Sequence, residues 1–211
     1  MIGEWIFGSR TTLENPSTSL ANPAAWLYDA LGATPSTSGV RVNQRTAFRY
    51  SAWWRGVNLL GSTVGKLPCF IYKRLDDGKE QDRTHFAYKI VRRKPNSEMN
   101  AMDYYQTMMV HVLTRGNHYS YIDRVRSGVM DGQVRELIPL DPAETYPVRE
   151  NGRLLYVTRV KRGLDPNAGY ELRKLNPDTV LHVKGMGYDG LVGYDVLEFA
   201  RNSLGLGMAA E

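Results

Sequence analysis

Apolar residues recur at helical spacing in the first third of the chain. Between Thr46 and about Val64, the positions Trp53, Val57, Leu60 and Val64 follow one another at intervals of four, three and four residues. Side chains at these intervals share one face of an α-helix. Thr46 can cap the first turn of such a helix, so we expect a helix over residues 46–64 whose apolar face packs on a core.

A short extended segment comes next. Gly65 and Pro68 are expected to end the first helix, because glycine tolerates a left-handed cap and proline lacks the backbone N–H. The strand-forming residues 69–72 follow, and the Asp-Asp-Gly sequence at 76–78 predicts a turn. The pattern therefore indicates a step from helix to strand.

Two more helices are predicted before residue 116. Thr84 opens a short one that must end before Pro95, since the residue before a proline disfavours helical backbone. Asn100 and Asp103 can cap a longer one, and Gly116 is placed to terminate it. The apolar stripe of this longer helix consists of Met102, Tyr105, Met109 and Val112. We expect this stripe to face the core.

From Asn117 onward the apolar period shortens from about 3.6 residues to about 2, which is typical of a β-strand. Tyr119, Tyr121 and Asp123 fall on one side of this strand, and Ser120, Ile122 and Arg124 fall on the other. Gly132 marks a turn after it. Further strands are expected at 134–140, 145–148, 153–160 and 180–183. The pattern predicts an antiparallel meander.

Two local signals refine the second half of the chain. Asn151-Gly152 lies between two expected strands and strongly favours a hairpin, because both residues tolerate a positive φ. A glycine-rich loop follows the last strand, and Asp195 with Glu198 has the spacing of a capping box that opens a final helix.

These elements define an α+β fold, with helices packed on a mostly antiparallel β-sheet. The start of the chain is rich in Ser, Thr, Asn, Pro and Gly and lacks sustained periodicity, so we expect a flexible N-terminal arm over residues 1–45. An α+β domain is expected over 46–194, followed by a terminal helix over 195–211.

The composition fits a folded protein of a reducing compartment. Hydrophobic residues make up 42% and charged residues 23% of the 211 positions, which is an ordinary globular balance. Cys69 is the single cysteine and excludes an intramolecular disulfide or a multi-cysteine metal site. The sequence has no long apolar run and no basic-then-apolar start, so we expect a soluble intracellular protein without membrane contact.

A glycine motif invites a cofactor interpretation. Residues 185–190 read GMGYDG, which matches GxGxxG after an expected strand and before a helix, and Glu211 lies near the position of a ribose-binding acid. In a dinucleotide site, however, the helix begins within the glycines. Here Gly190, Gly193 and the Asp195 cap delay it, so a loop is favoured. A small dinucleotide-binding enzyme remains a third alternative. The related pattern at 205–210 lacks a preceding strand and indicates close helix packing.

Other chemistry lacks candidate residues. His111 and His118 are separated by a helix end, and His85 and His182 belong to unrelated elements, so their spacing does not suggest zinc. The chain has no nucleophile elbow, phosphate loop or Asp-rich calcium loop. We therefore predict no catalytic, cofactor-binding or metal residues, no cofactor, and a protein that is not an enzyme.

The net charge of +5 permits nucleic-acid contact without requiring it. Aromatic residues stand near basic ones at 53–55 and at 119–124, an arrangement that could stack single-stranded bases. Core packing explains both groups better, because Trp53 lies on the apolar helix face and the tyrosines follow the strand alternation. A nucleic-acid-binding module of a mobile element is kept as the alternative function.

Several short segments, in a fixed order, resemble the phage portal protein family. They are SAWWRGVN at 51–58 continuing to KLP at 66–68 and FIY at 70–72, KPN at 94–96, LTRGNHY at 113–119, ELIPLDP at 136–142, VLHV at 180–183 and DGLVG at 189–193. Each segment alone is a turn or a cap with an ordinary structural use. Their shared order is what carries the resemblance, which extends from Thr46 to Glu211.

The resemblance implies a portal wing-like fold and a structural role. Portal subunits form a closed ring, commonly of twelve, at one capsid vertex of the virion. Double-stranded DNA is packaged and ejected through this head-tail connector, which also nucleates capsid assembly in the host cytoplasm. The implied partners are other copies of the chain, capsid and scaffold proteins, terminase, and head-completion and tail proteins. A separate terminase motor supplies the energy.

Two departures from the family pattern stand out. Tyr194 and Asp195 follow Gly193 where the family often has Ser-Pro, which we interpret as a different cap for the same helix. Portal subunits also continue into a stem, a clip and a crown, so the chain is expected to correspond to the outer wing. We therefore expect it to be monomeric or weakly associating alone, and to bind DNA weakly and in a salt-sensitive way.

Overall fold

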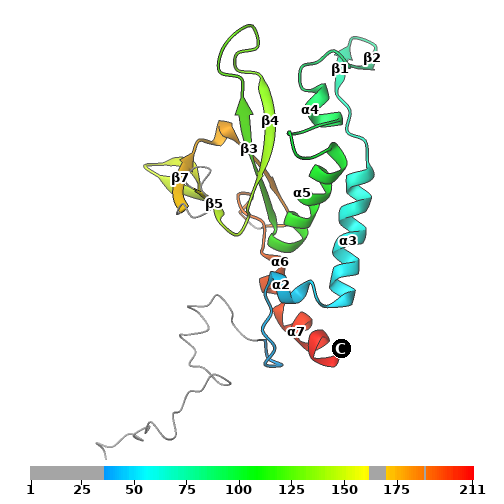
Figure 1. Cartoon of the computed structure of the whole chain (residues 1–211), viewed down its shortest axis with the longest axis vertical. Helices are drawn as coiled ribbons and strands as arrows, with labels where there is room; N and C mark the ends of the chain where they lie inside the picture. Colours follow the sequence, from blue (N-terminus) through cyan, green and yellow to red (C-terminus); the bar gives the residue numbers. More distant parts are fainter. Residues whose placement is uncertain (1–35, 162–169, 188) are drawn as a thin grey trace, which may run out of the picture.

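The structure, a computed structural model, describes residues 36–161, 170–187 and 189–211. It arranges helices and antiparallel strands in four successive layers (Figure 1). The outermost helix α3 (Ser51–Lys66) packs on α5 (Ala101–Arg115), and α5 packs on a first sheet. A second sheet lies beyond the first, on the side away from the helices. The predicted α+β class is confirmed.

The described strands form two three-stranded sheets and one hairpin. The inner sheet has the order β4-β3-β8, and the outer sheet has the order β5-β6-β7. Their bounds are β3 Asn117–Arg124, β4 Val134–Leu140, β5 Thr145–Glu150, β6 Arg153–Lys161, β7 Tyr170–Leu175 and β8 Val180–Lys184. Every pair is antiparallel, as expected, but the strands do not make one sheet. Strand β7 was not predicted.

The two sheets meet through a small aromatic core. Tyr119 of β3, Tyr156 of β6 and Val180 of β8 are buried together. Tyr119 pairs with Leu140 on one side and with His182 on the other, so it occupies the central strand of its sheet. Asn151 has φ 50° and Gly152 has φ 76°, which confirms the predicted hairpin between β5 and β6.

Helix α5 confirms its predicted ends. The Asn100 side chain accepts a hydrogen bond from the backbone N–H of Asp103 at 3.0 Å, and Gly116 closes the helix with φ 72°. Its predicted stripe is partly buried, apart from Met102, which is 41% exposed. Tyr104 and Thr114 are the residues that it buries fully.

The predicted start of the first helix is wrong. Asn43, and not Thr46, caps a short helix α2 (Gln44–Ala47). Thr46 is the third residue of that helix, and its hydroxyl accepts a hydrogen bond from the Asn43 N–H at 2.8 Å while Asn43 Oδ1 accepts from the Thr46 N–H at 2.9 Å. This reciprocal capping box fixes the start three residues earlier, and α3 begins separately at Ser51.

The end of α3 and the residues on its buried face differ from the prediction. Gly65 does not end the helix, which runs to Lys66 before Pro68. Gly61 and Gly65 are buried with Val57 because they face α5, and a Cβ at Gly65 would lie 2.9 Å from the Met102 carbonyl oxygen. Leu60 was assigned to the apolar core face, but it is 51% exposed. The closely approaching face of α3 is therefore lined by small residues.

The segment between α3 and α5 differs in detail from the prediction. A hairpin of β1 (Tyr72–Leu75) and β2 (Gly78–Gln81) replaces the expected strand at 69–72, although its turn lies at Asp76-Asp77 as predicted. Helix α4 (Tyr88–Arg92) begins after Ala87 and not at Thr84, because Asp82 accepts hydrogen bonds from the Thr84 and His85 N–H groups and holds a turn there. It ends before Pro95, as expected.

The two ends of the described chain pack together. The final helical segment is divided into α6 (Val196–Phe199) and α7 (Arg201–Ala210), and is not a single helix. These helices share a core with the segment at 36–47, made by Val42, Ala47, Leu197 and Leu204. Part of the predicted arm, residues 36–45, is therefore in contact with α7. The rest of the arm, 1–35, lies outside the described residues, and the division into arm, domain and terminal helix stays a prediction.

Candidate functional site at the glycine-rich junction

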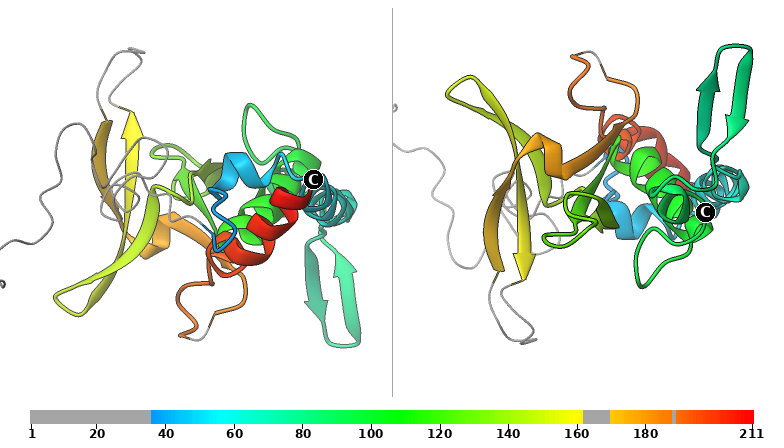
Figure 2. Two further views of the ribbon diagram at one scale, coloured as in Figure 1. Left: turned by 90° about the horizontal axis from the view of Figure 1, so that it is seen from below. Right: turned by 90° about the horizontal axis from the view of Figure 1, so that it is seen from above.

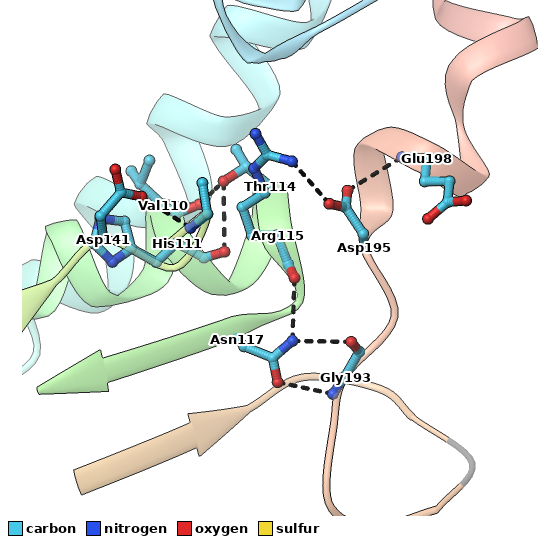
Figure 3. Close-up of polar contacts among 10 residues, drawn as sticks. Val110, His111, Thr114, Arg115, Asn117, Asp141, Gly193, Asp195 and Glu198 are labelled. Atoms are coloured by element: carbon cyan, nitrogen blue, oxygen red, sulfur yellow. Dashed lines mark hydrogen bonds and ion pairs between the residues drawn. The ribbon is translucent and has the colours of Figure 1, made fainter. Parts of the chain in front are cut away.

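Five segments that are distant in sequence converge at one point of the fold (Figure 3). They are the end of α5, the start of β3, the end of β8, the loop at 185–193 and the start of α6. We call this point the junction and define it by Arg115, Gly116, Asn117, Gly185, Gly193 and Asp195. Its polar contacts hold the helices, the inner sheet and the C-terminal helical segment together.

Gly116 does more at the junction than cap α5. Its backbone N–H donates to the Val112 carbonyl at 2.9 Å, and its own carbonyl accepts from the Gly185 N–H at 2.7 Å. A Cβ at this position would collide with the Tyr194 carbonyl. Glycine is thus required here both by the positive φ and by close backbone packing.

The GxGxxG segment is explained by the same close packing. A Cβ at Gly193 would collide with the Gly116 carbonyl, and one at Gly187 would collide with the Val192 carbonyl. The Asp189 carboxylate accepts hydrogen bonds from the Leu191 and Val192 N–H groups at 2.8 and 2.9 Å, which folds the loop on itself. The next helix begins at Val196, well after the glycines. This geometry differs from a dinucleotide site, where a helix N-terminus meets the phosphates directly.

The side chain of Asn117 ties the loop to β3. Its Oδ1 accepts a hydrogen bond from the Gly193 N–H at 2.8 Å, and its Nδ2 donates to the Gly193 carbonyl at 2.9 Å (Figure 3). Nδ2 also lies 3.2 Å from the Arg115 carbonyl, and Oδ1 accepts from His182 Nε2 at 3.0 Å. Asn117 is buried, so its side-chain amide supplies the hydrogen bonds that the Gly193 N–H and carbonyl do not receive from water.

An ion pair connects the end of α5 to the start of α6. Arg115 Nη1 lies 3.0 Å from Asp195 Oδ2, and Asp195 Oδ1 accepts from the Glu198 N–H at 3.1 Å (Figure 3). The predicted Asp195 cap is therefore confirmed, and the same carboxylate serves both contacts. Both side chains are a little under one-third exposed, so their attraction is moderately screened by water.

A buried histidine network extends from the junction along β3. His118 Nδ1 lies 3.0 Å from His111 Nδ1, and His118 Nε2 lies 2.8 Å from the Ser120 hydroxyl, which also contacts the Tyr104 hydroxyl at 2.8 Å. One of the two histidines must carry its proton on Nδ1 and the other must accept it. Burial, together with the neighbouring His111 and His182, lowers the pKa of His118 to about 3. The network is therefore neutral near pH 7.

His182 on β8 occupies the other side of the junction. Its ring stacks on Tyr119 at a centroid distance of 4.4 Å, and its Nδ1 lies 3.2 Å from the Tyr156 hydroxyl. Burial, with a smaller effect of Lys184, lowers the pKa of His182 to about 4. Reasoning from the sequence separated His111 from His118 by a helix end and placed His182 in an unrelated element. The pairing of β3 with β8 brings them close, and the spacing along the chain carried no signal of that pairing.

The arrangement is suited to holding segments in place. Among the described residues, no group of three or more His, Cys, Asp or Glu side chains converges as a metal site. A groove of about 520 Å³ lies beside His111, between residues 96–99, α5 and residues 138–142. No helix in the described ranges is long and apolar enough to cross a bilayer. Tyr119 is buried between the two sheets, which leaves its ring unable to stack on a base.

A comparison with known families decides the interpretation. Residues 51–211 match the family model described as phage portal protein. The chain belongs to the phage portal protein family. This portal chain is 26% identical over 209 residues to the portal protein of Enterobacteria phage HK97, covering 98% of the chain and 45% of that relative. It is also 30% identical over 119 residues to protein BeeE of Escherichia coli K12, covering 56% of the chain and 73% of that relative. The chain thus spans less than half the length of the HK97 protein.

Solved structures agree with the portal fold. A chain from the neck of an empty gene transfer agent particle, computed with C6 symmetry, superposes with a TM-score of 0.60 at 20% identity and covers 88% of this chain and 48% of its own. A chain from the neck of a native particle, computed with C12 symmetry, gives 0.57 at 20% identity, with 79% and 41% covered. An HK97 family portal protein from Corynebacterium diphtheriae gives 0.50 at 17%, with 77% and 45% covered.

The segments that carry the family resemblance contact one another in this portal chain. The Pro95 carbonyl accepts from the Leu137 N–H at 2.8 Å, and Asn96 Nδ2 donates to the Leu137 carbonyl at 2.9 Å. The segment at 94–96 is thus bonded to the segment at 136–142. In the same way, Asn117 bonds the segment at 113–119 to Gly193. These contacts give the four segments a structural role within the fold.

Proposed function

We propose that the chain is a structural part of a phage portal ring, the head-tail connector at one capsid vertex. Double-stranded DNA passes through this ring during packaging and ejection, and the ring nucleates assembly of the shell. The match of residues 51–211 to the portal family carries this proposal. The chain belongs to the virion at its portal vertex, after assembly in the host cytoplasm.

The proposed role is mechanical and not catalytic. The polar groups of the junction bind within the chain, Asn117 to Gly193 and Arg115 to Asp195. In the adjoining histidine network His118 binds His111 and Ser120. Groups already satisfied in this way stabilise a rigid unit and are poorly placed to act on a substrate. A separate terminase motor supplies the energy for DNA movement.

Within the ring, residues 46–194 serve as the wing-like domain, and α6 and α7 lead toward the stem of a full-length portal. The partners are other copies of the chain, most simply twelve in a closed ring, together with capsid and scaffold proteins, terminase, and head-completion and tail proteins. The C12 symmetry used for a similar neck chain supports a twelve-membered ring.

The proposal is tested by stopping the reading frame early in the phage or prophage that encodes it. Particles are then purified and the nuclease-protected DNA per shell is measured, with electron microscopy of the vertices. We expect shells without packaged DNA or aberrant shells, and recovery when the intact gene is supplied in trans. A normal yield of DNA-filled particles from the disrupted gene would refute the proposed function.

A further inference from the structure

Helix α3 presents an apolar outer face that nothing in the described part of the chain covers. Its inner face, with Val57, Gly61 and Gly65, contacts α5. Leu59 and Leu60 lie away from that contact and are 60% and 51% exposed. Large apolar side chains gathered on one exposed helix face are typical of a protein interface.

The outer sheet carries large exposed apolar side chains on its edge strands β5 and β7, on the face where Val157 of the central strand β6 is already buried. The side chains of Leu154, Tyr156 and Leu175 point toward the inner sheet. Because side chains alternate along a strand, the opposite face carries the residues between them and their cross-strand neighbours. On that opposite face Tyr146, Tyr170 and Leu172 are between 49% and 67% exposed.

Two charged side chains on this outer face, Lys174 and Arg159, have partners within the sheet. Lys174 Nζ lies 2.6 Å from Glu150 Oε1 across β6, and the Arg159 guanidinium lies over the Tyr170 ring at 4.5 Å. Covering charges that are already paired avoids leaving an isolated buried charge. The part of the face around Lys174 and Arg159 can therefore be buried by an apolar partner.

The two faces lie at opposite ends of the molecule. In Figure 1 and in both views of Figure 2 the outer sheet is at one end and α3 is at the other, with the inner sheet and α5 between them. A contact that repeats around a closed ring joins two different surfaces of each subunit, whereas a two-fold dimer joins one surface to itself. Two distinct apolar faces at opposite ends meet the requirement of a ring.

We propose that α3 of one subunit packs on the outer sheet of the next, so that Leu59 and Leu60 cover the face that carries Tyr170 and Leu172. The occupant of each face is thus a second copy of this chain. This inference rests on the ring proposed above and names the surfaces through which its wings touch.

Mixed chemical cross-linking tests the contact. Cys69 is exposed and is first replaced by serine in every variant. Protein carrying Leu60→Cys is then mixed in concentrated solution with protein carrying Leu172→Cys and treated with a short bismaleimide linker. The matched control replaces Leu172→Cys with Val129→Cys, which is more exposed than Leu172 and lies in the β3–β4 loop.

The mixed Leu60→Cys and Leu172→Cys product is expected to exceed both the Val129→Cys control and the Leu60→Cys self-product by about tenfold. Leu59→Lys, added to the Leu60→Cys protein, is expected to abolish that excess, with circular dichroism unchanged because the Leu59 side chain is exposed. Equal products with Val129→Cys, dominant self-products, or no product at all would each overturn the proposed contact. The gene-disruption test does not depend on which faces touch, so the proposed ring can hold while this contact fails.

Discussion

Three glycines of α3 allow the packing of α3 on α5 to be tested by one substitution. The same substitution to alanine is made in one helix at Gly56, Gly61 and Gly65, whose surroundings differ. A Cβ at Gly56 meets nothing within 4 Å. At Gly61 it would lie 3.4 Å from Val110 Cγ2, and at Gly65 it would lie 2.9 Å from the Met102 carbonyl oxygen.

The expected effects follow from two opposing contributions. Alanine is favoured over glycine inside a helix by about 1 kcal/mol, so Gly56→Ala is expected to stabilise the protein by about that amount. Gly61→Ala forms an ordinary van der Waals contact, and a stabilisation of about 0–1 kcal/mol is expected. At Gly65 the added methyl group must push α3 away from α5, which costs about 1–3 kcal/mol. Gly65→Ala is therefore expected to destabilise the protein by up to about 2 kcal/mol.

Thermal and urea unfolding measure the series. In a chain of this size 1 kcal/mol moves the Tm by about 2–4 °C, so Gly56→Ala and Gly65→Ala are expected to differ by on the order of 5 °C, with opposite signs relative to the parent. The urea m value should stay constant, which shows that the folded state is the one affected. If Gly65→Ala were as stable as Gly56→Ala, the close approach of the two helices at Gly65 would be refuted.

Three further predictions concern the junction. The folded pKa values of His118 and His182 are about 3 and about 4, below the ordinary 6.5, so the unfolded chain takes up protons first and stability should fall as the pH drops from about 6.5 toward 4. The Tm measured against pH should show this fall, and His182→Gln should make its slope shallower. Asn117→Ala leaves the Gly193 N–H and carbonyl unpaired and should lower the free energy of unfolding in urea by about 2–4 kcal/mol. A loss near zero would contradict a stabilising role for the hydrogen bonds between Asn117 and Gly193. A double-mutant cycle of Arg115→Met and Asp195→Asn should give a coupling free energy below about 1 kcal/mol that weakens with added salt, because the pair is partly exposed. A coupling free energy that salt leaves unchanged would contradict the screening of this ion pair by solvent.

Local signals in the sequence located many elements correctly. Asn100, Gly116 and Asp195 were recognised as caps, and Asn151-Gly152 as a hairpin turn, because each acts through its own backbone or through residues three positions away. The first helix was misplaced for a related reason. Asn43 and Thr46 are both good capping residues, and the choice between them depends on hydrogen bonds that the apolar pattern of α3 does not reveal.

Long-range pairing was the part that could not be predicted. Gly65 was expected to break a helix, but its role depends on Met102 of another helix. His118 and His182 became neighbours through strand pairing, and the glycines at 185–193 through contact with Gly116. The division into two sheets likewise depends on which strand lies next to β3. Each of these features depends on a contact between two residues that are far apart in the sequence. The pattern of a single sequence does not reveal which distant residues will be in contact.

The shared core of the N-terminal segment and α7 has a consequence for the order of folding. The Thr37 N–H donates to Asn202 Oδ1 at 3.2 Å across a separation of 165 residues, and Val42 is buried with Leu204. During synthesis Val42 leaves the ribosome long before its partner exists. The Val42 side chain therefore stays exposed to water or in a temporary contact until nearly the whole described chain has emerged. Completion of this core is a late step, which delays any surface that depends on it until the inner layers have formed.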